Sequence, residues 1–276
     1  MAARESLVKV LITIIMAVFG LMFLLPFLWM LTSSFKPEVD VFKYPIEWIP
    51  STWNAVSNYT QVWAKSDFPI YYWNSIKIAV STTALSVMFS CMAAYGFSKV
   101  NFKGREAIFI LVLVIYMVPH QAILVPQFLI YKWIGLFDNH FGLILLNSFS
   151  VLGTFLLRQF FIGINNEYLE SARMDGAGHF RSFFSIALPL VRPAIATYAI
   201  LRFIWTWNDY QNPLIFLRTK SLFTLQLGIN SFADMNGDFY SLIMAAAVSA
   251  ILPLLIVFIA GQKNVIEGIA MGGVKG

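Results

Sequence analysis

Polar side chains that could bind a ligand by hydrogen bonding or ring stacking stand inside stretches of the chain that are otherwise apolar. The candidates are His120, Gln121, Asn147, Arg202, Trp205, Asn208 and Asp209. A charge near the centre of a bilayer costs at least about 2.5–3.5 kcal/mol, so Arg202 is expected to face a cavity rather than lipid. Its acceptors would be a carboxylate of a neighbouring subunit, carbonyl groups at a bend, or water. The alternative is that these side chains only hold helices together.

Motifs for catalysis are missing from the sequence. It contains no G-x-x-x-x-G-K-[ST] phosphate loop, no G-x-S-x-G and no H-E-x-x-H. The three histidines are far apart, and no His/Cys cluster has the spacing of metal ligands. The sequence therefore predicts no catalytic residue, no metal site and no cofactor bound by this chain.

The composition indicates a membrane protein. Hydrophobic residues make up 59% of the chain and charged residues only 12%, and the mean hydropathy is +0.72. A soluble domain has about 25% charged residues, and half that share cannot cover a water-exposed surface. The net charge of +5 does not indicate a nucleic-acid partner, because the basic residues lie in short segments between apolar runs. The single cysteine, Cys91, is expected to be a small core residue.

Six apolar stretches are long enough to cross a membrane, at about 20 residues per helix. They are Leu7–Leu31, Ser75–Phe97, Ala107–Tyr131, Phe141–Phe161, Pro193–Leu217 and Tyr240–Ala260. The first is longer than a signal-peptide core, so we expect a retained span. Pro119 and Pro126 interrupt the third, and Pro213 interrupts the fifth, which either continues or ends near Trp207. The predicted fold class is an all-α membrane protein with about six transmembrane helices.

The distribution of Lys and Arg orients the chain. With the N-terminus inside, the short inner segments receive most of the basic residues, among them Lys99, Arg105, Arg173 and Lys263. The outer basic residues lie mostly in long loops, which obey the rule weakly. Both termini and the segment 170–189 are therefore predicted to face the cytoplasm.

Two apolar segments are not spans. The first, about forty residues between the first two spans, is rich in Trp and Pro, which indicates an interfacial aromatic belt or a partner contact. In the second, Arg218 to Phe239, Phe223, Leu225 and Leu227 alternate with polar residues, which fits either a strand or a short surface helix.

The segment Glu170–Pro189 is polar, basic and glycine-centred, and it lies between two strongly apolar stretches. Asn165 or Asn166 is expected to cap a helix that ends near Asp175, with Gly176 as its stop. A second short helix is expected after it, so the segment is predicted to be a helix–glycine–helix unit.

The second short helix is expected from about His179. On it, apolar side chains fall on one face at i, i+3, i+4 and i+7, namely Phe180, Phe183, Phe184 and Ala187. This apolar ridge, flanked by charges, would suit a groove on another protein.

This segment resembles the EAA-type loop of ABC importer permeases. The match consists of Glu170, two small residues after it, Gly176 at a fixed offset, and an I-x-L-P exit ending at Pro189. In that family the loop docks the membrane subunit onto a cytoplasmic ATPase, so the resemblance implies a coupling loop within residues 162–192. The residues it implies for this role are Glu170, Ser171, Ala172, Asp175, Gly176, Ala177, Phe180, Leu188 and Pro189.

Two further resemblances point to carbohydrate importers. The ending G-G-V-K-G is similar to the tail of the smaller permease of maltose-type systems, which reaches into the ATPase dimer interface, and Gly272, Gly273 and Lys275 would lie there. A glycine-rich tail is otherwise simply flexible. The W-N-D-Y sequence from Trp207 to Tyr210 looks like the fifth-span signature of the group. Together the resemblances cover roughly residues 75 to 276.

The resemblance implies a permease subunit with the type I fold of ABC importers, in a prokaryotic inner or cytoplasmic membrane, importing an oligosaccharide or related sugar. Its implied partners are a second homologous permease, two ATP-binding subunits that hold ATP and magnesium, an extracytoplasmic solute-binding protein and membrane lipid. The expected division is 1–74 (first helix and outer loop), 75–261 (core with the loop 162–192) and 262–276 (cytoplasmic tail). The alternative is an ion-coupled secondary transporter, for which inverted repeats would be evidence.

Overall fold

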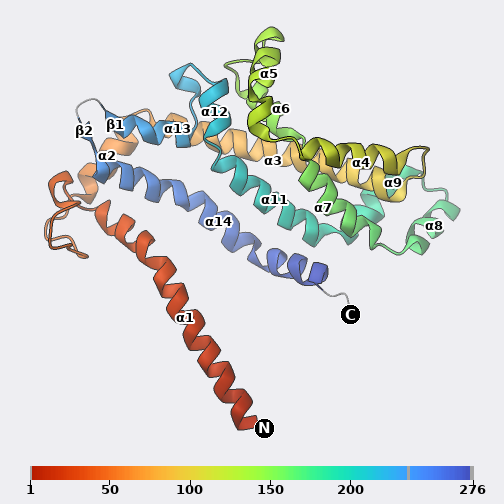
Figure 1. Cartoon of the computed structure of the whole chain (residues 1–276), viewed down its shortest axis with the longest axis horizontal. Coiled ribbons are helices and arrows are strands. Elements are labelled where there is room, and N and C mark those ends of the chain that lie inside the picture. The colour runs from red at the N-terminus through yellow and green to blue at the C-terminus, as the bar shows by residue number, and fades with distance from the viewer. Residues whose placement is uncertain (1, 235–236, 274–276) are drawn as a thin grey trace. The chain divides into compact units, whose positions relative to one another are not determined.

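The computed structural model describes residues 2–234 and 237–273, and almost all of its regular structure is helical (Figure 1). The prediction of a helical membrane protein is confirmed. One small antiparallel hairpin accompanies the helices, in which β1 (Ala233–Asp234) pairs with β2 (Gly237–Asp238).

The helices of the first half are α1 (Ala2–Ser33), the 3-10 helix η1 (Glu38–Asp40), α2 (Ala55–Ala64), α3 (Phe68–Lys99), α4 (Arg105–Tyr116), α5 (His120–Trp133), α6 (His140–Ser148) and α7 (Val151–Ile162). Those of the second half are α8 (Asn166–Met174), α9 (His179–Ser182), the π-helical turn η2 (Phe183–Ala187), α10 (Leu188–Leu190), α11 (Arg192–Trp207), α12 (Gln211–Phe216), η3 (Lys220–Leu222), α13 (Leu225–Ile229), η4 (Asn230–Phe232) and α14 (Tyr240–Gly273).

The chain packs as two compact units, 1–69 with 228–252 and 70–227 with 253–276. In the first unit, the Glu38 carboxylate accepts hydrogen bonds from the backbone N–H groups of Tyr240 (2.9 Å) and Ser241 (2.8 Å), at the start of α14. An acidic side chain is favoured there by the helix dipole. The side chains of α1 from Val8 to Leu28 are all exposed and almost all apolar. That surface requires lipid or another protein to cover it.

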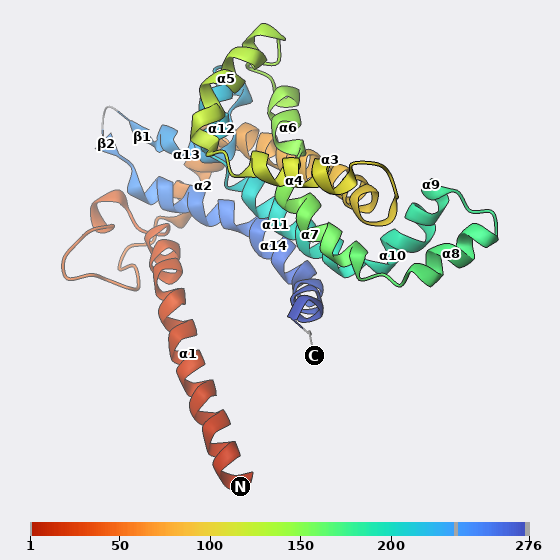
Figure 2. The same cartoon turned by 45° about the vertical axis from the view of Figure 1, so that its right-hand side comes forward.

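The second unit has its core where α3, α7 and α11 meet, and Figure 2 shows these helices side by side. Tyr198 of α11 is fully buried, and its hydroxyl lies 2.8 Å from the hydroxyl of Ser86 on α3. Arg158 of α7 donates to the Phe97 carbonyl at the end of α3 (3.1 Å) and to the Glu106 carboxylate at the start of α4 (2.9 Å). Both bonds hold the helices together at one end of the bundle.

Three helical stretches of the described residues are long and apolar enough to cross a membrane, 8–33, 68–99 and 240–263. Three more spans result if each bent helix pair counts as one: α4 with α5 (97°), α6 with α7 (43°), and the 179–190 segment with α11 (80°). The predicted end of the fifth span near Trp207 is confirmed, since α11 ends at Trp207 and a separate helix, α12, begins at Gln211.

The predicted interruption of the third span at Pro119 is confirmed, and its two helices are bent by 97° relative to each other. α4 ends at Tyr116 and α5 begins at His120, because Pro119 has no N–H to donate and disfavours helical backbone at the residue before it. Pro126, by contrast, lies within α5.

The fourth span, predicted over 141–161, contains a break that the sequence analysis did not predict. Phe149 is extended, and the Ser150 hydroxyl accepts the N–H of Gly153 at 3.0 Å, so Ser150 is the N-cap of a new helix. The serine before an apolar run was a signal of this break in the sequence.

The second of the two segments that are not spans, Arg218 to Phe239, contains a short helix, α13, rather than a strand over its apolar alternation. Its start is held in the second unit, where Asn74 of α3 donates to the carbonyls of Ser221 (2.9 Å) and Phe223 (3.0 Å). Leu225 and Leu227 are buried. The expected division at residues 74 and 261 follows membrane topology rather than these packing units, and it stays a prediction.

Candidate functional site: the polar loop and the polar cavity

The first helix of the polar loop begins and ends as predicted. The Asn165 side chain accepts the N–H of Glu167 at 3.1 Å, which caps α8. At the other end Gly176 has φ +80°, and its N–H donates to the Arg173 carbonyl (2.9 Å) while the N–H of Ala177 donates to the Ala172 carbonyl (2.9 Å). This pair of bonds is the Schellman motif, which requires a left-handed residue at the glycine position.

The predicted apolar ridge on the second half of the loop is wrong. Phe183 and Ala187 are buried, whereas Phe180 (74% exposed) and Phe184 (59%) face outward. The cause is the π-helical turn η2, whose wider turn keeps residues four apart on one face but separates residues three apart. The loop therefore has an anchored apolar side and an exposed one.

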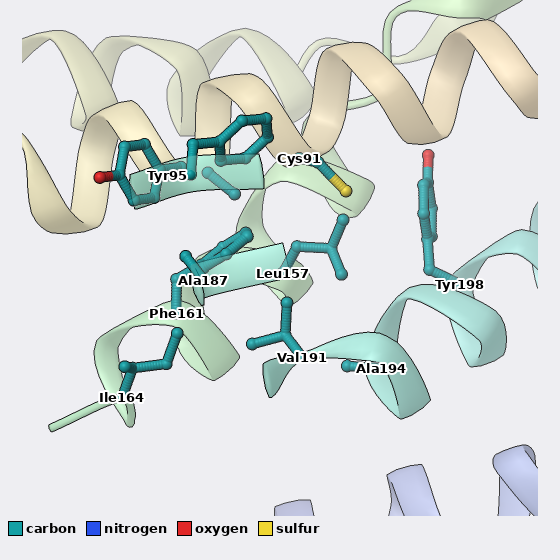
Figure 3. Close-up of a cluster of buried hydrophobic side chains, with 11 residues drawn as sticks. Cys91, Tyr95, Leu157, Phe161, Ile164, Ala187, Val191, Ala194 and Tyr198 are labelled. Carbon is teal, nitrogen blue, oxygen red and sulfur yellow. The ribbon is translucent and has the colours of Figure 1, made fainter. Parts of the chain in front are cut away.

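The buried side of the loop packs on the end of the bundle (Figure 3). The Tyr95 ring of α3 contacts the rings of Phe161 in α7 (centroids 5.9 Å apart) and Phe183 in η2 (5.0 Å). Ile164 and Ala187 complete this aromatic base, and both are buried. The base fixes the loop to two helices of the second unit, α3 and α7.

The predicted contact residues of the loop divide by exposure. Ala172 is buried, and Ala177 and Leu188 are half-buried. The other six are exposed, namely Glu170, Ser171, Asp175, Gly176, Phe180 and Pro189. Two apolar residues that the sequence reasoning did not select, Tyr168 (60%) and Met174 (89%), are also exposed on α8. An exposed surface that mixes apolar and charged side chains on a rigid base is suited to docking with another protein.

Four of the seven polar candidates form one hydrogen-bonded network at the opposite end of α11. Arg202 donates through Nη2 to the carbonyl oxygen of Asn147, at the end of α6. The Asn147 amide lies 3.5 Å from the Asp209 carboxylate, which also accepts from the Asn212 amide (2.8 Å) and the Asn212 N–H (3.1 Å). His120 Nε2 lies 3.4 Å from Asn212 Oδ1.

The acceptor of Arg202 is therefore a carbonyl group at a bend, one of the three alternatives. Asn147 lies just before the break at Phe149, where the chain leaves α6. Backbone carbonyls at a helix end have no intrahelical donor, so the guanidinium satisfies an oxygen that the break leaves open. Sequence reasoning did not select Asn212, whose position inside N-D-Y-Q-N gave no sign that it would bridge two helices.

The network borders a cavity of about 670 Å³ between α4, α5, α6, α7 and α11. Its polar lining comprises His120, Gln127, Asn147, Ser150, Arg202 and Trp205. Arg202 Nε and Gln127 Oε1 are buried with no hydrogen-bond partner among the described residues. Because buried polar atoms are normally paired, this wall has capacity for further hydrogen bonds.

The remaining candidates lie elsewhere. Gln121 is exposed on α5, and Asn208 is exposed, with its amide donating to the carbonyl of Ile204 at 2.9 Å. Of the tail residues, Gly272 and Gly273 end α14, while Lys275 lies outside the described residues. Within 2–234 and 237–273, no group of three or more His, Cys, Asp or Glu could hold a metal ion.

Comparisons with known proteins show which family the chain belongs to. The family described as "Binding-protein-dependent transport system inner membrane component" matches residues 86–270. The chain is 36% identical, over 98% of its length and 97% of the relative's, to an arabinooligosaccharides transport system permease protein of Bacillus subtilis. It is 30% identical, over 91% of its length and 90% of the relative's, to a lactose transport system permease protein of Rhizobium radiobacter.

A solved structure of a bacterial ABC transporter for alginate contains a chain with the same fold. The TM-score is 0.83 at 24% identity, covering 94% of this chain and 97% of that one. The family match covers both the polar loop and the polar cavity. The chain therefore belongs to the binding-protein-dependent transport system inner membrane component family, the permease subunits of ABC importers.

Proposed function

We propose that this permease imports a neutral carbohydrate, delivered by an extracytoplasmic binding protein and driven by two separate ATP-hydrolysing subunits that hold ATP and magnesium. The observation that carries the sugar assignment is the near full-length similarity to permeases named for arabinooligosaccharides and lactose. The polar cavity is consistent with it, because sugars bind through hydrogen bonds and through stacking on rings such as that of Trp205.

Reconstitution tests the proposal. The chain, a second permease, the ATPases and the binding protein are placed in proteoliposomes, and uptake of labelled neutral oligosaccharides is measured. Uptake should require both ATP and the binding protein. Uptake driven by a proton or sodium gradient without the ATPases would instead support the ion-coupled alternative.

The exposed side of the loop 162–192 is proposed to dock on an ATPase subunit. The support is its construction, with Phe183 and Ala187 buried in the aromatic base while Phe180 and Met174 stay exposed. Closure of the ATPases would then move α8 as a rigid unit, because the Schellman motif and the base fix its two ends. Glu170 and Asp175 would supply charged contacts beside the apolar ones.

A cross-linking pair tests this docking. In a Cys91→Ser background, Met174→Cys should cross-link to the ATPase subunit. The matched control is Trp133→Cys, which is equally exposed (87%) but lies at the end of α5. Cross-linking to the ATPase from residue 133 and not from residue 174 would contradict the assignment.

The cavity that contains His120, Asn147 and Arg202 is proposed to line the translocation pathway. Support comes from its unpaired Arg202 Nε and Gln127 Oε1 and from its position at the breaks of two helix pairs. Gln121, Trp205, Asn208 and Asp209 would lie along the same route. Breaks inside spans are tolerated where they line a cavity rather than lipid.

The proposed topology places both termini and the loop in the cytoplasm, and α12 and α13 outside, toward the binding protein. The distribution of Lys and Arg supports this orientation. In it, Gly272 and Gly273 at the end of α14, together with Lys275, would lie near the ATPases. The exposed apolar side chains of α1 would then contact lipid and the second permease.

A further inference from the structure

Lys99, the last residue of α3, holds the segment through which the chain enters the polar loop. Its ammonium group donates to the carbonyl of Ile164 (2.6 Å) and to the side-chain oxygen of Asn166 (2.7 Å). The carbonyl of Ile162 lies 3.5 Å from the same nitrogen. One side chain of α3 therefore bonds to three positions within five residues of the α7–α8 connection.

The acceptors explain why a lysine suits this position. Ile162 is the last residue of α7, so its carbonyl belongs to the negative end of that helix, where a cation is favoured. Asn166 is the first residue of α8. Lys99 thus joins the end of one helix and the start of the next to a third helix, through bonds in which the donor is charged.

The same turn of α3 also contacts the exit of the loop. Tyr95 is four residues before Lys99, one helical turn away, and its ring packs on Phe183 with centroids 5.0 Å apart. The final turn of α3 therefore holds the entry of the loop through Lys99 and its exit through Tyr95. A displacement of α8 relative to α3 would have to stretch the Lys99 bonds.

We infer that Lys99 is a positioning residue for energy coupling, which transmits the movement of α8 into the spanning helix α3. This inference rests on the proposed docking of the loop on an ATPase. Without the three bonds, the 162–166 connection can shift while α3 stays in place, so ATP hydrolysis would continue without moving the span. The defect expected is a lower number of solute molecules imported per ATP hydrolysed.

The test uses the complete importer in proteoliposomes, with uptake and ATP hydrolysis measured on the same vesicles. Lys99→Met keeps the length of the apolar stem and removes the donors, and Lys99→Arg keeps a charged donor. Lys103→Met is the matched control, since Lys103 is an exposed lysine in the connection between α3 and α4. Gly176→Val in the same assay tests whether the loop 162–192 couples ATP hydrolysis to uptake.

The expected result is that Lys99→Met, which removes all three bonds, lowers the ratio of uptake to ATP hydrolysis at least about tenfold, the factor that corresponds to one hydrogen bond to a charged group. Lys99→Arg should restore most of the ratio, and Lys103→Met should leave it unchanged. The inference is overturned if Lys99→Met keeps the ratio within about twofold, or if uptake and hydrolysis fall together with the amount of assembled complex. If Gly176→Val also leaves the ratio unchanged, the docking proposal itself fails; if only Gly176→Val lowers it, the role of Lys99 alone is wrong.

Discussion

The ring of Tyr198 lies directly against the backbone of Gly153, so that a Cβ placed on residue 153 would come 2.2 Å from the Tyr198 Cζ and hydroxyl oxygen. Tyr198 cannot easily move away, since it is fully buried and its hydroxyl is paired with Ser86 at 2.8 Å. This contact joins α7 to α11, and the Ser86 hydroxyl joins both helices to α3.

Gly153→Ala should therefore destabilise the second unit by about 1–3 kcal/mol, the usual cost of overpacking a core. Thermal unfolding of the purified complex in detergent measures the effect. Gly96→Ala is the matched control, because Gly96 is also helical and a Cβ added there would meet nothing within 4 Å. Equal stability of the two variants would contradict the close packing at Gly153.

Gly176→Val should uncouple ATP hydrolysis from uptake while leaving membrane insertion intact. The left-handed φ of +80° is costly for any residue with a Cβ, by roughly 1–2 kcal/mol, and more for a β-branched one. Gly178→Val serves as control, since Gly178 has an ordinary φ of −72°. Normal uptake by the Gly176 variant, with all partners present, would remove the loop from the coupling role.

Arg202→Leu should assemble but lower uptake about tenfold, because the Asn147 carbonyl loses its charged hydrogen-bond donor. Arg202→Lys should retain part of the uptake, since one charged donor remains. The exposed Arg218, changed to Leu, controls for loss of a positive charge elsewhere in the chain. A fully active Arg202→Leu variant would exclude the residue from the pathway.

Asp138 lies in the turn between α5 and α6, and its carboxylate accepts from the Thr219 hydroxyl (2.6 Å) and from the N–H groups of Thr219 (3.0 Å) and Arg218 (2.8 Å). These three hydrogen bonds lower the pKa of Asp138 below the usual range of an aspartate, and the bond from the Thr219 side chain contributes most. Since the folded-state pKa is the lower one, the stabilisation is complete above the ordinary aspartate pKa of about 4 and is lost as the pH falls through the folded-state value.

Asp138→Asn should remove that pH dependence, and it keeps a residue that tolerates the positive φ of 54°. The measurement is the unfolding temperature of the complex between about pH 3 and pH 7, the interval that brackets an aspartate titration. The wild type should lose more stability than the variant toward the acid end. Parallel curves would show that the Asp138 bonds do not contribute.

The features that could be predicted from the sequence are those that depend on neighbours along the chain. Apolar run length indicated the membrane spans, and the caps at Asn165 and Gly176 follow from local backbone chemistry. The break at Pro119 was predicted in the same way, whereas the N-cap at Ser150, although readable in the sequence, was not used to predict the break in the fourth span.

Which distant residues meet depends on how the helices pack in three dimensions. Arg202 and Asn147 are 55 residues apart, His120 and Asn212 are 92 apart, and Lys99 and Asn166 are 67 apart. Helical periodicity assigns a side chain to a face but does not select the helix on which that face packs. The π-helical turn η2 likewise depends on packing, since it places Phe183 in the aromatic base and turns Phe180 outward, against the pattern of a regular helix.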